Sequence, residues 1–276
     1  MSDRYAVFGN PVRHSLSPRI HALFAAATGQ DLTYEAVEAP VGGFREAVLA
    51  FRDAGGRGAN VTVPFKEEAY ALCARVSERA QRAAAVNTLS FEAGGAVVGD
   101  NTDGAGLVRD LTQRLGLDLG GARILLLGAG GAARGVLGPL LLEGAAEIVV
   151  ANRTEARARA LERAFGGLGR VRACGLAAIP PGPYDLVLNA TAASLAGEVP
   201  PLDEVVLAGA PLCYDLAYAR DGLTPFVAWA RGRGLRAEDG LGMLVEQAAE
   251  AFALWRGVRP ETAPVLAALR GGAAGQ

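Results

Sequence analysis

The chain has 276 residues, 27 of them lysine or arginine and 29 aspartate or glutamate, which gives a formal net charge of −2 at pH 7. At roughly 150 residues per domain, this length predicts about two domains. The chain lacks the excess of positive charge that draws proteins to nucleic acid or to anionic membranes, so we expect neither partner. Of its cationic residues, 26 are arginine and one, Lys66, is lysine. Arginine keeps its proton at any working pH, so Lys66 is the one side-chain amine able to exchange a proton in chemistry.

The first residues and the cysteines indicate a compartment. The stretch from Met1 to Asn10 has an acid at position 3 and no apolar core, unlike a signal peptide. The longest stretches free of charged residues have 12 residues, well below the roughly 18 apolar residues of a membrane span. Cys73, Cys174 and Cys213 are odd in number and far apart, so they form neither a disulfide framework nor a metal-ligand spacing. We expect a cytoplasmic protein with reduced thiols, no bound metal and no membrane contact.

Apolar periodicity and turn residues divide the first hundred residues into alternating strands and helices. Ser17 and Pro18 predict a helix start, with serine as N-cap and proline at the first helical position. Asn60 and Thr62 alternate along one strand and therefore share a face. The predicted elements are strands at Arg4–Phe8, Leu32–Val37 and Ala59–Val63, helices from Ser17, at Phe44–Ala54 and from Pro64, and a hairpin of residues 85–91 and 96–98.

The second part of the chain alternates strongly apolar strands with helices, which is typical of a parallel sheet with both faces covered. A helix at Gly104–Leu115 precedes this region and a long helix at Leu241–Trp255 follows it, and we expect the tail Gly271–Gln276 to be disordered. The predicted strands are Ile124–Leu127, Glu147–Ala151, Val171–Ala173, Leu186–Asn189 and Leu212–Asp215. The fold class is therefore α/β.

A glycine-rich turn follows the first of these strands. Gly128, Gly130 and Ala133 form a G-x-G-x-x-A pattern between an apolar strand and a helical pattern. A dinucleotide-binding turn needs a glycine for tight reversal, a second for close approach to the pyrophosphate and a small residue for packing. Glycine-rich loops also produce this pattern by chance, but the order of strand, turn and helix favours a phosphate site at the helix N-terminus.

The end of the next strand bears on which dinucleotide binds. An acid there bonds the ribose of NAD and repels a 2′-phosphate. This chain has Asn152, Arg153 and Thr154 instead, a cation beside a hydroxyl. The alternative is that Arg153 is only a solvated surface residue and that Asn152 or Thr154 only caps the next helix. We predict NADP, because the absent acid and the present cation point the same way.

Proton transfer requires a group that gives and takes a proton at the substrate oxygen. The chain has only two histidines, His14 and His21, and Lys66 stands at a helix start directly after the strand of Asn60 and Thr62. Asp103 is either the N-cap of the following helix or a carboxylate that orients Lys66. The pair makes chemical sense only if the fold brings the two side chains together.

Seven motifs in order, from about Ala6 to Trp255, resemble the shikimate dehydrogenase family. This resemblance implies the reversible, NADP-dependent reduction of 3-dehydroshikimate to shikimate in aromatic amino-acid biosynthesis. The motifs are His14–Pro18, Asn60–Lys66, Ala85–Thr88, Gly99–Gly104, Gly128–Ala133, Asn152–Thr154 and Asp239–Ala248.

The resemblance also implies roles for single residues. Lys66 and Asp103 match the catalytic pair. Substrate-binding positions match Ser15, Ser17, Thr62, Asn87, Asp103, Tyr218 and Gln247. Cofactor-binding positions match Gly128, Ala129, Gly130, Gly131, Ala132, Asn152, Arg153, Thr154, Leu216 and Gly240.

Two segments depart from the family pattern. The family has a proline two residues after the position of Tyr218, where this chain has Arg220. After Asn189 the family continues toward a Gly-Met pair, whereas this chain has Ser194 and Leu195.

The resemblance implies two domains. Residues 1–102 and 240–276 form an α/β substrate domain, and residues 103–239 form an inserted Rossmann-type NADP-binding domain with a parallel sheet. The family implies a monomer or a homodimer. Three other functions remain open: a dehydrogenase that acts on quinate, a non-catalytic sensor of shikimate and NADP, and a folate dehydrogenase of similar design. Ser15 and Ser17 disfavour the first, retention of Lys66 and Asp103 disfavours the second, and the Asn60–Lys66 motif disfavours the third.

Overall fold

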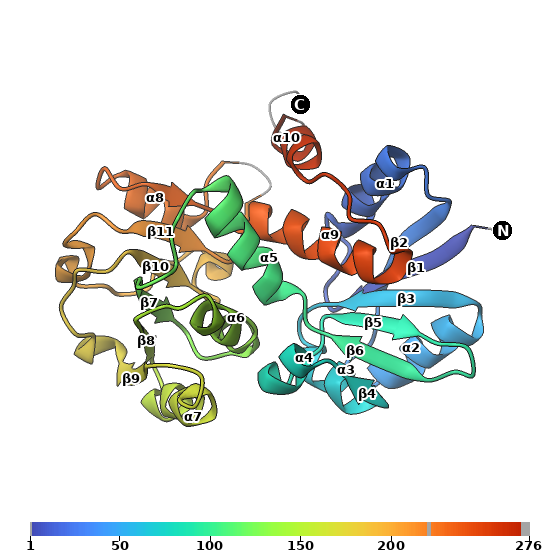
Figure 1. Cartoon of the computed structure of the whole chain (residues 1–276), viewed down its shortest axis with the longest axis horizontal. Coiled ribbons are helices and arrows are strands. Elements are labelled where there is room, and N and C mark those ends of the chain that lie inside the picture. Colours follow the sequence, from blue (N-terminus) through green and yellow to red (C-terminus); the bar gives the residue numbers. More distant parts are fainter. Residues whose placement is uncertain (1, 220–221, 272–276) are drawn as a thin grey trace. The chain divides into compact units, whose positions relative to one another are not determined.

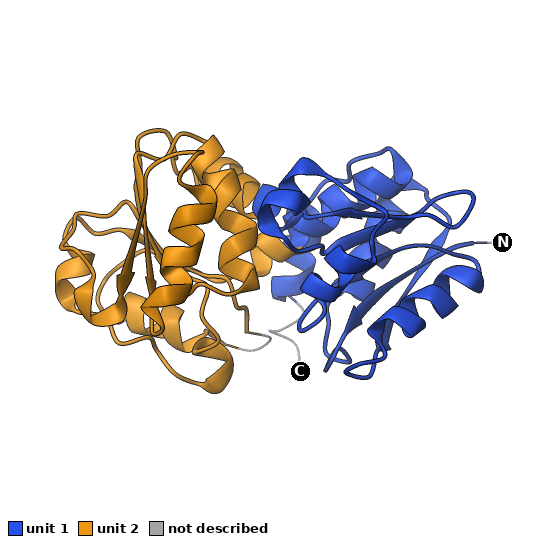
Figure 2. Cartoon of the chain, turned by 90° about the horizontal axis from the view of Figure 1, so that it is seen from below, with its two compact units in different colours: residues 1–106, 245–276 blue, residues 107–244 orange. Residues whose placement is uncertain are grey.

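The computed structural model describes residues 2–219 and 222–271 and divides into two compact units. Unit 1 is Met1–Gly106 with Val245–Gln276, and unit 2 is Leu107–Leu244 (Figure 2). The sequence places its boundaries after residues 102 and 239, whereas the units divide after residues 106 and 244. The divisions lie inside helices α5 (Asp103–Arg109) and α9 (Leu241–Arg256), because both helices continue from one unit into the other.

Unit 1 contains a mixed sheet of β1 (Asp3–Gly9), β2 (Leu32–Glu38), β3 (Gly56–Val61), β4 (Arg75–Val76), β5 (Thr88–Phe91) and β6 (Val97–Asp100) (Figure 1). Within the described residues the strand order is β2-β1-β3-β5-β6-β4. β5 runs antiparallel to both of its neighbours, β3 and β6. β3 and β6 therefore run in the same direction, and their carboxyl ends meet the amino end of β5 at one edge of the sheet.

Alternate residues of β1 face opposite sides of this sheet. Phe8 packs edge-to-face against Phe44 on the face covered by α2 (Phe44–Asp53), α3 (Lys66–Leu72) and α4 (Glu78–Ala83). On the other face Tyr5 stacks on Trp255 of α9 at 4.7 Å between ring centroids. α1 (Ser17–Thr28) adds Phe24, whose ring contacts Phe252 of α9. α10 (Ala263–Gly271) completes the described part of unit 1.

Unit 2 contains a parallel sheet of β7 (Arg123–Leu127), β8 (Glu147–Asn152), β9 (Val171–Gly175), β10 (Leu186–Asn189), β11 (Leu212–Asp215) and β12 (Ala237–Glu238). Its order among the described residues is β12-β11-β10-β7-β8-β9. In chain order this is the 3-2-1-4-5-6 arrangement of dinucleotide-binding sheets, in which the direction of winding reverses beside the first strand. A Rossmann-type α/β fold is thus confirmed.

Both faces of this sheet are buried, which explains the near-continuous apolar strands. Ile124 and Leu126 of β7 belong to a core that also contains residues of α5, α6 (Gly131–Leu142) and α7 (Glu155–Phe165). Leu125 and Leu127 face the opposite core, with residues of α8 (Pro225–Arg231). Three short 3-10 turns, Leu176–Ala178, Ser194–Ala196 and Glu204–Leu207, connect strands among the described residues.

Several local expectations need correction. Ser17 is not the N-cap of α1, because Leu16 already has helical dihedral angles, and the Ser17 backbone N–H instead donates to Ser15 Oγ. The helix predicted at Gly104–Leu115 is α5 followed by a π-helical segment, η1, at Asp110–Arg114. Elements α4, α8, α10, β4 and β12 were not predicted, because each is short or weakly periodic. Of the tail predicted to be disordered, Gly271 ends α10 and residues 272–276 lie outside the described residues.

Candidate active site and cofactor-binding turn

The carboxyl edge of the unit 1 sheet collects the predicted catalytic residues. Lys66 begins α3, which follows β3, and Asp103 begins α5, which follows β6. Asn87 precedes β5, the strand between β3 and β6, and therefore reaches the same edge. Asn60, Thr88 and Asp100 are paired across the three strands and fix this register. Residues 16 to 37 positions apart in the sequence thus meet at one end of the sheet.

Lys66 and Asp103 form an ion pair. Lys66 Nζ lies 2.5 Å from Asp103 Oδ2, and the two side chains are 20% and 9% exposed. The pair is therefore partly shielded from water, while the ammonium still reaches the surface. The hydrogen bond to the carboxylate fixes the direction of Lys66 Nζ. The fold therefore brings Lys66 and Asp103 together, as their predicted role as a pair requires.

Asn87 connects this pair to other polar side chains. Its Nδ2 donates to Asp103 Oδ1 (2.7 Å), to Thr102 Oγ1 (3.0 Å) and to Gln247 Oε1 (3.2 Å). Its Oδ1 accepts from the Thr102 N–H and from Thr88 Oγ1, both at 2.8 Å. Because Asn87 is buried, the loss of these partners would leave polar atoms unsatisfied. Asn87 thereby directs Oδ2 of Asp103 toward Lys66.

Ser15, Ser17 and Thr62 belong to two neighbouring segments of unit 1. Ser15 and Ser17 stand at the start of α1, and Thr62 directly follows β3. Thr62 packs so close to Gly9 that a Cβ there would lie 2.5 Å from Thr62 Cγ2. Thr62 therefore lies beside the end of β1, and all three side chains carry the hydroxyl groups expected of substrate ligands.

A second group of buried polar side chains joins Tyr34 to Asn60 and Thr88. Tyr34 Oη donates to Asn60 Oδ1 (2.7 Å), and Asn60 Nδ2 donates to Thr88 Oγ1 (3.1 Å) and to the Asn87 carbonyl (3.2 Å). His21 stacks on the Tyr34 ring at 4.1 Å with an angle of 5° between the planes. Burial raises the pKa of Tyr34 well above its usual value and lowers the pKa of His21 to about 3. Both groups are therefore neutral at pH 7, and neither serves as an acid or base.

The glycine-rich turn of unit 2 lies at the point where the sheet reverses its winding. Gly128 directly follows β7 and has φ +102°, which side chains rarely tolerate. A Cβ on Gly128 would lie 2.9 Å from the carbonyl oxygen of Ala190, which follows β10. The glycine is therefore required by the crossing of two backbones. In sheets of this type, ligands bind outside the carboxyl ends of the strands at this position.

The start of α6 fits the phosphates of a dinucleotide. Gly130 is the N-cap residue and Gly131 begins the helix, and no side chain caps it. A Cβ added at either glycine would meet no atom within 4 Å, so the space before the helix is open on the side where these glycines lie. Ala133, by contrast, is completely buried in the core beneath the turn. Ala129 and Ala132 complete the same turn. Free backbone N–H groups at a helix N-terminus bind anionic phosphate.

Asn152, Arg153 and Thr154 occupy the junction between β8 and α7. Asn152 ends β8 and its Nδ2 donates to the Thr154 carbonyl (2.9 Å). Thr154 is at the N-cap position of α7 but makes no side-chain cap, so its hydroxyl does not serve the helix. Arg153 is exposed. The Thr154 hydroxyl and the Arg153 guanidinium therefore stand together at this junction, with neither used to cap α7.

Leu216 and Gly240 are adjacent in space although 24 positions apart in the sequence. A Cβ on Gly240 would lie 2.3 Å from the Leu216 carbonyl oxygen, and the Gly240 N–H donates to the Ala217 carbonyl at 2.9 Å. Both residues are at the carboxyl side of the unit 2 sheet, after β11 and before α9. Tyr218 lies two residues after Leu216, is half-buried and belongs to unit 2.

Two residues that complete these clusters, Thr102 and Asp215, were not predicted from the sequence. Thr102 lies between Asn87 and Gln247 and is completely buried. Asp215, completely buried in unit 2, accepts from Asn189, Ser194 and Thr224, so Ser194 of the departing segment holds a buried carboxylate. Thr102 stood inside a matched motif, whereas no pattern marked the partners of Asp215, because they are distant in sequence.

The described residues contain neither a metal-binding cluster nor a membrane-spanning helix. Within residues 2–219 and 222–271, no group of three or more histidine, cysteine, aspartate or glutamate side chains is arranged to hold a metal ion. In the same residues, helices with the length and apolar character needed to cross a bilayer are absent. Cys73, Cys174 and Cys213 are free thiols.

Family models match three regions of the chain. Residues 7–89 match the shikimate dehydrogenase substrate binding domain, residues 110–196 match shikimate / quinate 5-dehydrogenase, and residues 240–270 match the shikimate 5'-dehydrogenase C-terminal domain. The Lys66–Asn87 region therefore falls in the first match and the glycine-rich turn in the second.

Known proteins are similar over nearly the whole chain. Shikimate dehydrogenase (NADP(+)) of Methylococcus capsulatus is 58% identical over 268 residues, 97% of this chain and 96% of that protein. The crystal structure of an Ael1 enzyme from Pseudomonas putida has a TM-score of 0.91 at 51% identity, covering 97% and 98% of the two chains. Shikimate 5-dehydrogenase of Thermus thermophilus in complex with NADP(H) and shikimate has a TM-score of 0.85 at 36% identity, covering 98% and 99%. The chain therefore belongs to the shikimate dehydrogenase family.

Proposed function

We propose that this chain is an NADP-dependent oxidoreductase that reversibly reduces 3-dehydroshikimate to shikimate, with Lys66 and Asp103 as its proton-transferring pair. The observation that carries the assignment of residues is the 2.5 Å contact between Lys66 Nζ and Asp103 Oδ2 at the edge where Asn87 and Gln247 converge. The family and the named relatives support the activity and the cofactor.

The proton moves through Lys66. In the direction of reduction, the Lys66 ammonium donates a proton to the carbonyl oxygen of the substrate as that carbon becomes a secondary alcohol. In the reverse direction, the neutral amine accepts the hydroxyl proton. The Asp103 carboxylate accepts from Lys66 Nζ and holds it in position. An arginine at this position would not exchange a proton, because its pKa is too high.

Substrate recognition uses groups that match a hydroxylated, anionic ring. Hydroxyl and amide side chains donate to and accept from the hydroxyls and carboxylate of shikimate, and an analogue that lacks a partner would leave buried polar groups unpaired. Asn87 and Gln247 are already oriented by their bonds to each other and to Thr102. We assign substrate binding to Ser15, Ser17, Thr62, Asn87, Asp103, Tyr218 and Gln247.

Cofactor binding uses the carboxyl side of the unit 2 sheet. A bound cofactor would supply the redox chemistry at the substrate carbon: NADPH would give a hydride in the direction of reduction, and NADP+ would take one in the direction of oxidation. The turn Gly128–Ala132 and the N-terminus of α6 would hold the pyrophosphate, and Arg153 with Asn152 and Thr154 would hold the 2′-phosphate. Leu216 and Gly240 would lie on the nicotinamide side of the site.

The direct test is a spectrophotometric assay of NADPH formation with the purified chain. Shikimate and quinate are each combined with NADP and with NAD. We expect turnover with shikimate and NADP, and slower turnover in the other three combinations. Absence of turnover with every pair, while both ligands bind, would favour a sensor instead.

A dehydrogenase that accepts quinate is the second candidate, because the family model matched by residues 110–196 covers both shikimate and quinate enzymes. The same assay separates the two, since a kcat/KM for quinate equal to that for shikimate would replace the first proposal with this one.

We further propose that the enzyme acts in the cytoplasm on its small-molecule substrate alone, as a monomer or homodimer. The three free thiols support this compartment, because disulfides persist in oxidising compartments and are rare in the cytosol. Size-exclusion chromatography with light scattering measures the oligomeric state.

A further inference from the structure

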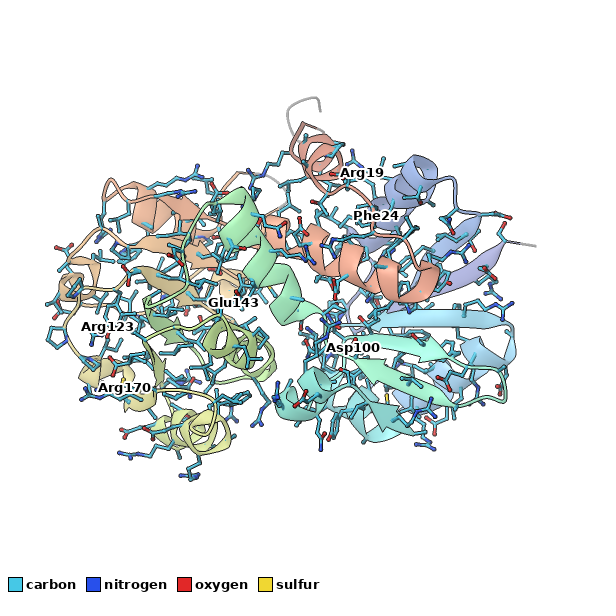
Figure 3. The ribbon with its side chains drawn as sticks, viewed as in Figure 1. Arg19, Phe24, Asp100, Arg123, Glu143 and Arg170 are labelled. Carbon is cyan, nitrogen blue, oxygen red and sulfur yellow. The ribbon has the colours of Figure 1, made fainter. Side chains whose placement is uncertain are left out.

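Arg79, the second residue of α4, binds the side chain of the last residue of strand β6. Its Nε donates to Asp100 Oδ1 (2.7 Å) and its Nη2 donates to Asp100 Oδ2 (2.8 Å), a two-point contact between guanidinium and carboxylate. Asp100 is the last residue of β6 and is labelled in Figure 3. Ser77 Oγ, from the residue before α4, also donates to Asp100 Oδ1 (2.5 Å). The Asp100 carboxylate is thus held from two directions by the segment at the start of α4.

Asp100 in turn holds the backbone that carries the catalytic carboxylate. Asp100 Oδ1 accepts from the Asn101 N–H (2.7 Å), and the Asp100 carbonyl accepts from the Asn87 N–H (3.0 Å). Asp103 follows three residues later, and its own N–H donates to Asn101 Oδ1 (3.2 Å). A shift of Asp100 therefore moves the turn that aims Asp103 at Lys66.

The third donor of Arg79 reaches a different element. Arg79 Nη1 donates to Glu250 Oε1 (3.0 Å) on α9, within one turn of Gln247. Arg259 holds Glu250 in place, because its Nη1 donates to Glu250 (2.8 Å). Its Nη2 donates to Glu246, which also lies on α9 (2.6 Å). One guanidinium therefore joins the helix that carries Gln247 to the strand end that leads to Asp103.

We propose that Arg79 is a positioning residue that sets the distance between the catalytic carboxylate of Asp103 and the substrate-binding amide of Gln247. This inference rests on the proposed function of those two residues. Arg79 does not touch the reacting atoms; it acts through Asp100 and Glu250. Its three contacts require three N–H groups in one plane, which arginine offers and lysine does not.

The electrostatics agree with a permanent contact. Burial raises the pKa of the Asp100 carboxyl, but the hydrogen bonds from Arg79 and Ser77 and the Arg79 charge outweigh it, so this pKa lies below its ordinary value. Side chains of Arg79, Asp100 and Glu250 are 28%, 16% and 22% exposed, so water competes only in part for these bonds. The contact is therefore charged and intact at neutral pH.

The test compares Arg79→Lys and Arg79→Gln with Arg75→Lys. Arg75 also binds a carboxylate, because its Nη2 donates to both oxygens of Glu92, but this pair is 62% and 45% exposed and Arg75 belongs to the edge strand β4. We measure kcat, the KM for shikimate, the NADPH dissociation constant by fluorescence, and the isotope effect with deuterated NADPH. Thermal denaturation records folding of each variant.

We expect Arg79→Lys to lower kcat/KM for shikimate roughly tenfold and Arg79→Gln to lower it more, because misplacement by a fraction of an ångström weakens a reaction geometry. The isotope effect should rise, while the NADPH dissociation constant and all values for Arg75→Lys stay within about twofold. In the reduction of 3-dehydroshikimate, a larger isotope effect without loss of NADPH affinity means that hydride transfer, with the proton transfer that accompanies it, has become slower relative to binding and release. General destabilisation does not produce this pattern.

Wild-type kinetics in a folded Arg79→Lys variant would overturn the inference and leave the proposed function intact, whereas an inactive wild-type chain would overturn the proposed function itself. If Arg79→Gln fails to fold, Glu250→Gln supplies the second variant, because it keeps an acceptor but removes the charge that Arg79 meets on α9. It should raise the KM for shikimate more than it lowers kcat, and an unchanged KM would count against the proposal.

Discussion

The two units build their sites from different parts of the chain. In unit 1, side chains meet side chains: Lys66 contacts Asp103, and Asn87 links Asp103 to Gln247. In unit 2, backbone meets backbone, since Gly128 approaches the Ala190 carbonyl and Gly240 approaches the Leu216 carbonyl. The first kind of site depends on the chemistry of single groups, and the second depends on the absence of a Cβ.

This contrast follows from what each site has to do. Proton transfer needs a group of the right acidity held within hydrogen-bond reach, which only side chains supply. Binding a pyrophosphate needs several N–H groups on an open surface, which a glycine turn and a helix N-terminus supply. Substitutions in unit 1 should therefore lower the rate of catalysis, whereas substitutions in unit 2 should lower the affinity for the cofactor.

The largest effect is expected for Asp103→Asn in unit 1. The substitution keeps the shape of the side chain but removes the charge that orients Lys66, so kcat should fall roughly a thousandfold. NADPH affinity should stay within about twofold, because the cofactor residues lie in unit 2. Steady-state kinetics and fluorescence titration measure both, with exposed Asp53→Asn as the control. A loss of NADPH affinity as large as the loss of kcat would contradict the assignment of catalysis to unit 1 and of cofactor binding to unit 2.

Gly240→Ala should produce the opposite pattern. A Cβ 2.3 Å from the Leu216 carbonyl forces two backbones apart, so kcat/KM for NADPH should fall on the order of a hundredfold. Shikimate binding, measured by calorimetry, should be retained. Gly167→Ala is the matched control, because a Cβ there meets no atom within 4 Å. Equal kinetics for the two alanine variants would show that the close approach is not required.

The stability of unit 1 should depend on pH through the buried side chain of His21. Burial lowers the pKa of His21 to about 3, below its ordinary value of 6.5. Its contribution to stability is therefore complete above pH 6.5 and is lost as the pH falls toward 3, by about 2 kcal/mol between pH 7 and pH 5. Urea unfolding at both values, followed through Trp255 of unit 1 in a Trp229→Phe background, measures this loss.

His21→Phe supplies the comparison, because phenylalanine can keep the ring stacked on Tyr34 without a titrating group. The difference in unfolding free energy between pH 7 and pH 5 should shrink by about 2 kcal/mol in this variant. The same loss on acidification in the wild type and in His21→Phe would show that other groups control acid stability.

The smallest effect is expected for Arg153→Gln. Arg153 is exposed, so water and salt weaken its contact, and NADPH affinity should fall about tenfold, as for the loss of one charge-assisted bond. NADH affinity should not change. Arg163→Gln, an exposed residue farther along α7, is the control. An equal loss for NADPH and NADH would assign Arg153 to general charge attraction instead of the 2′-phosphate.

Local patterns predicted much of this molecule because their causes are local. The strands Leu186–Asn189 and Leu212–Asp215 have the predicted bounds, since buried parallel strands are continuous apolar runs between turns. The glycine turn was likewise visible, because Gly128, Gly130 and Ala133 each serve a nearby requirement. The dihedral angles of Leu16, which displaced the predicted cap at Ser17, depend on how the preceding loop enters α1.

The contacts that complete the sites could not be read in this way. Asn87 meets Gln247 across 160 positions, and Arg79 meets Glu250 across 171. Sequence spacing does not contain such distances; they follow from the packing of α9 on the unit 1 sheet, where Trp255 stacks on Tyr5. The order of strands, which places the ends of β3 and β6 on either side of the start of β5, brings Lys66 to Asp103. Lys66 stood out through composition, but its partner became certain only through topology.

The replacement Lys66→Arg tests the central claim most directly. Arginine keeps the positive charge and the pairing with Asp103 but does not release a proton at working pH. We expect shikimate and NADPH to bind within about threefold of the wild type while kcat falls by at least a hundredfold. Turnover close to the wild-type rate in this variant would mean that charge alone is required at residue 66, and the proton-transfer role of Lys66 would be wrong.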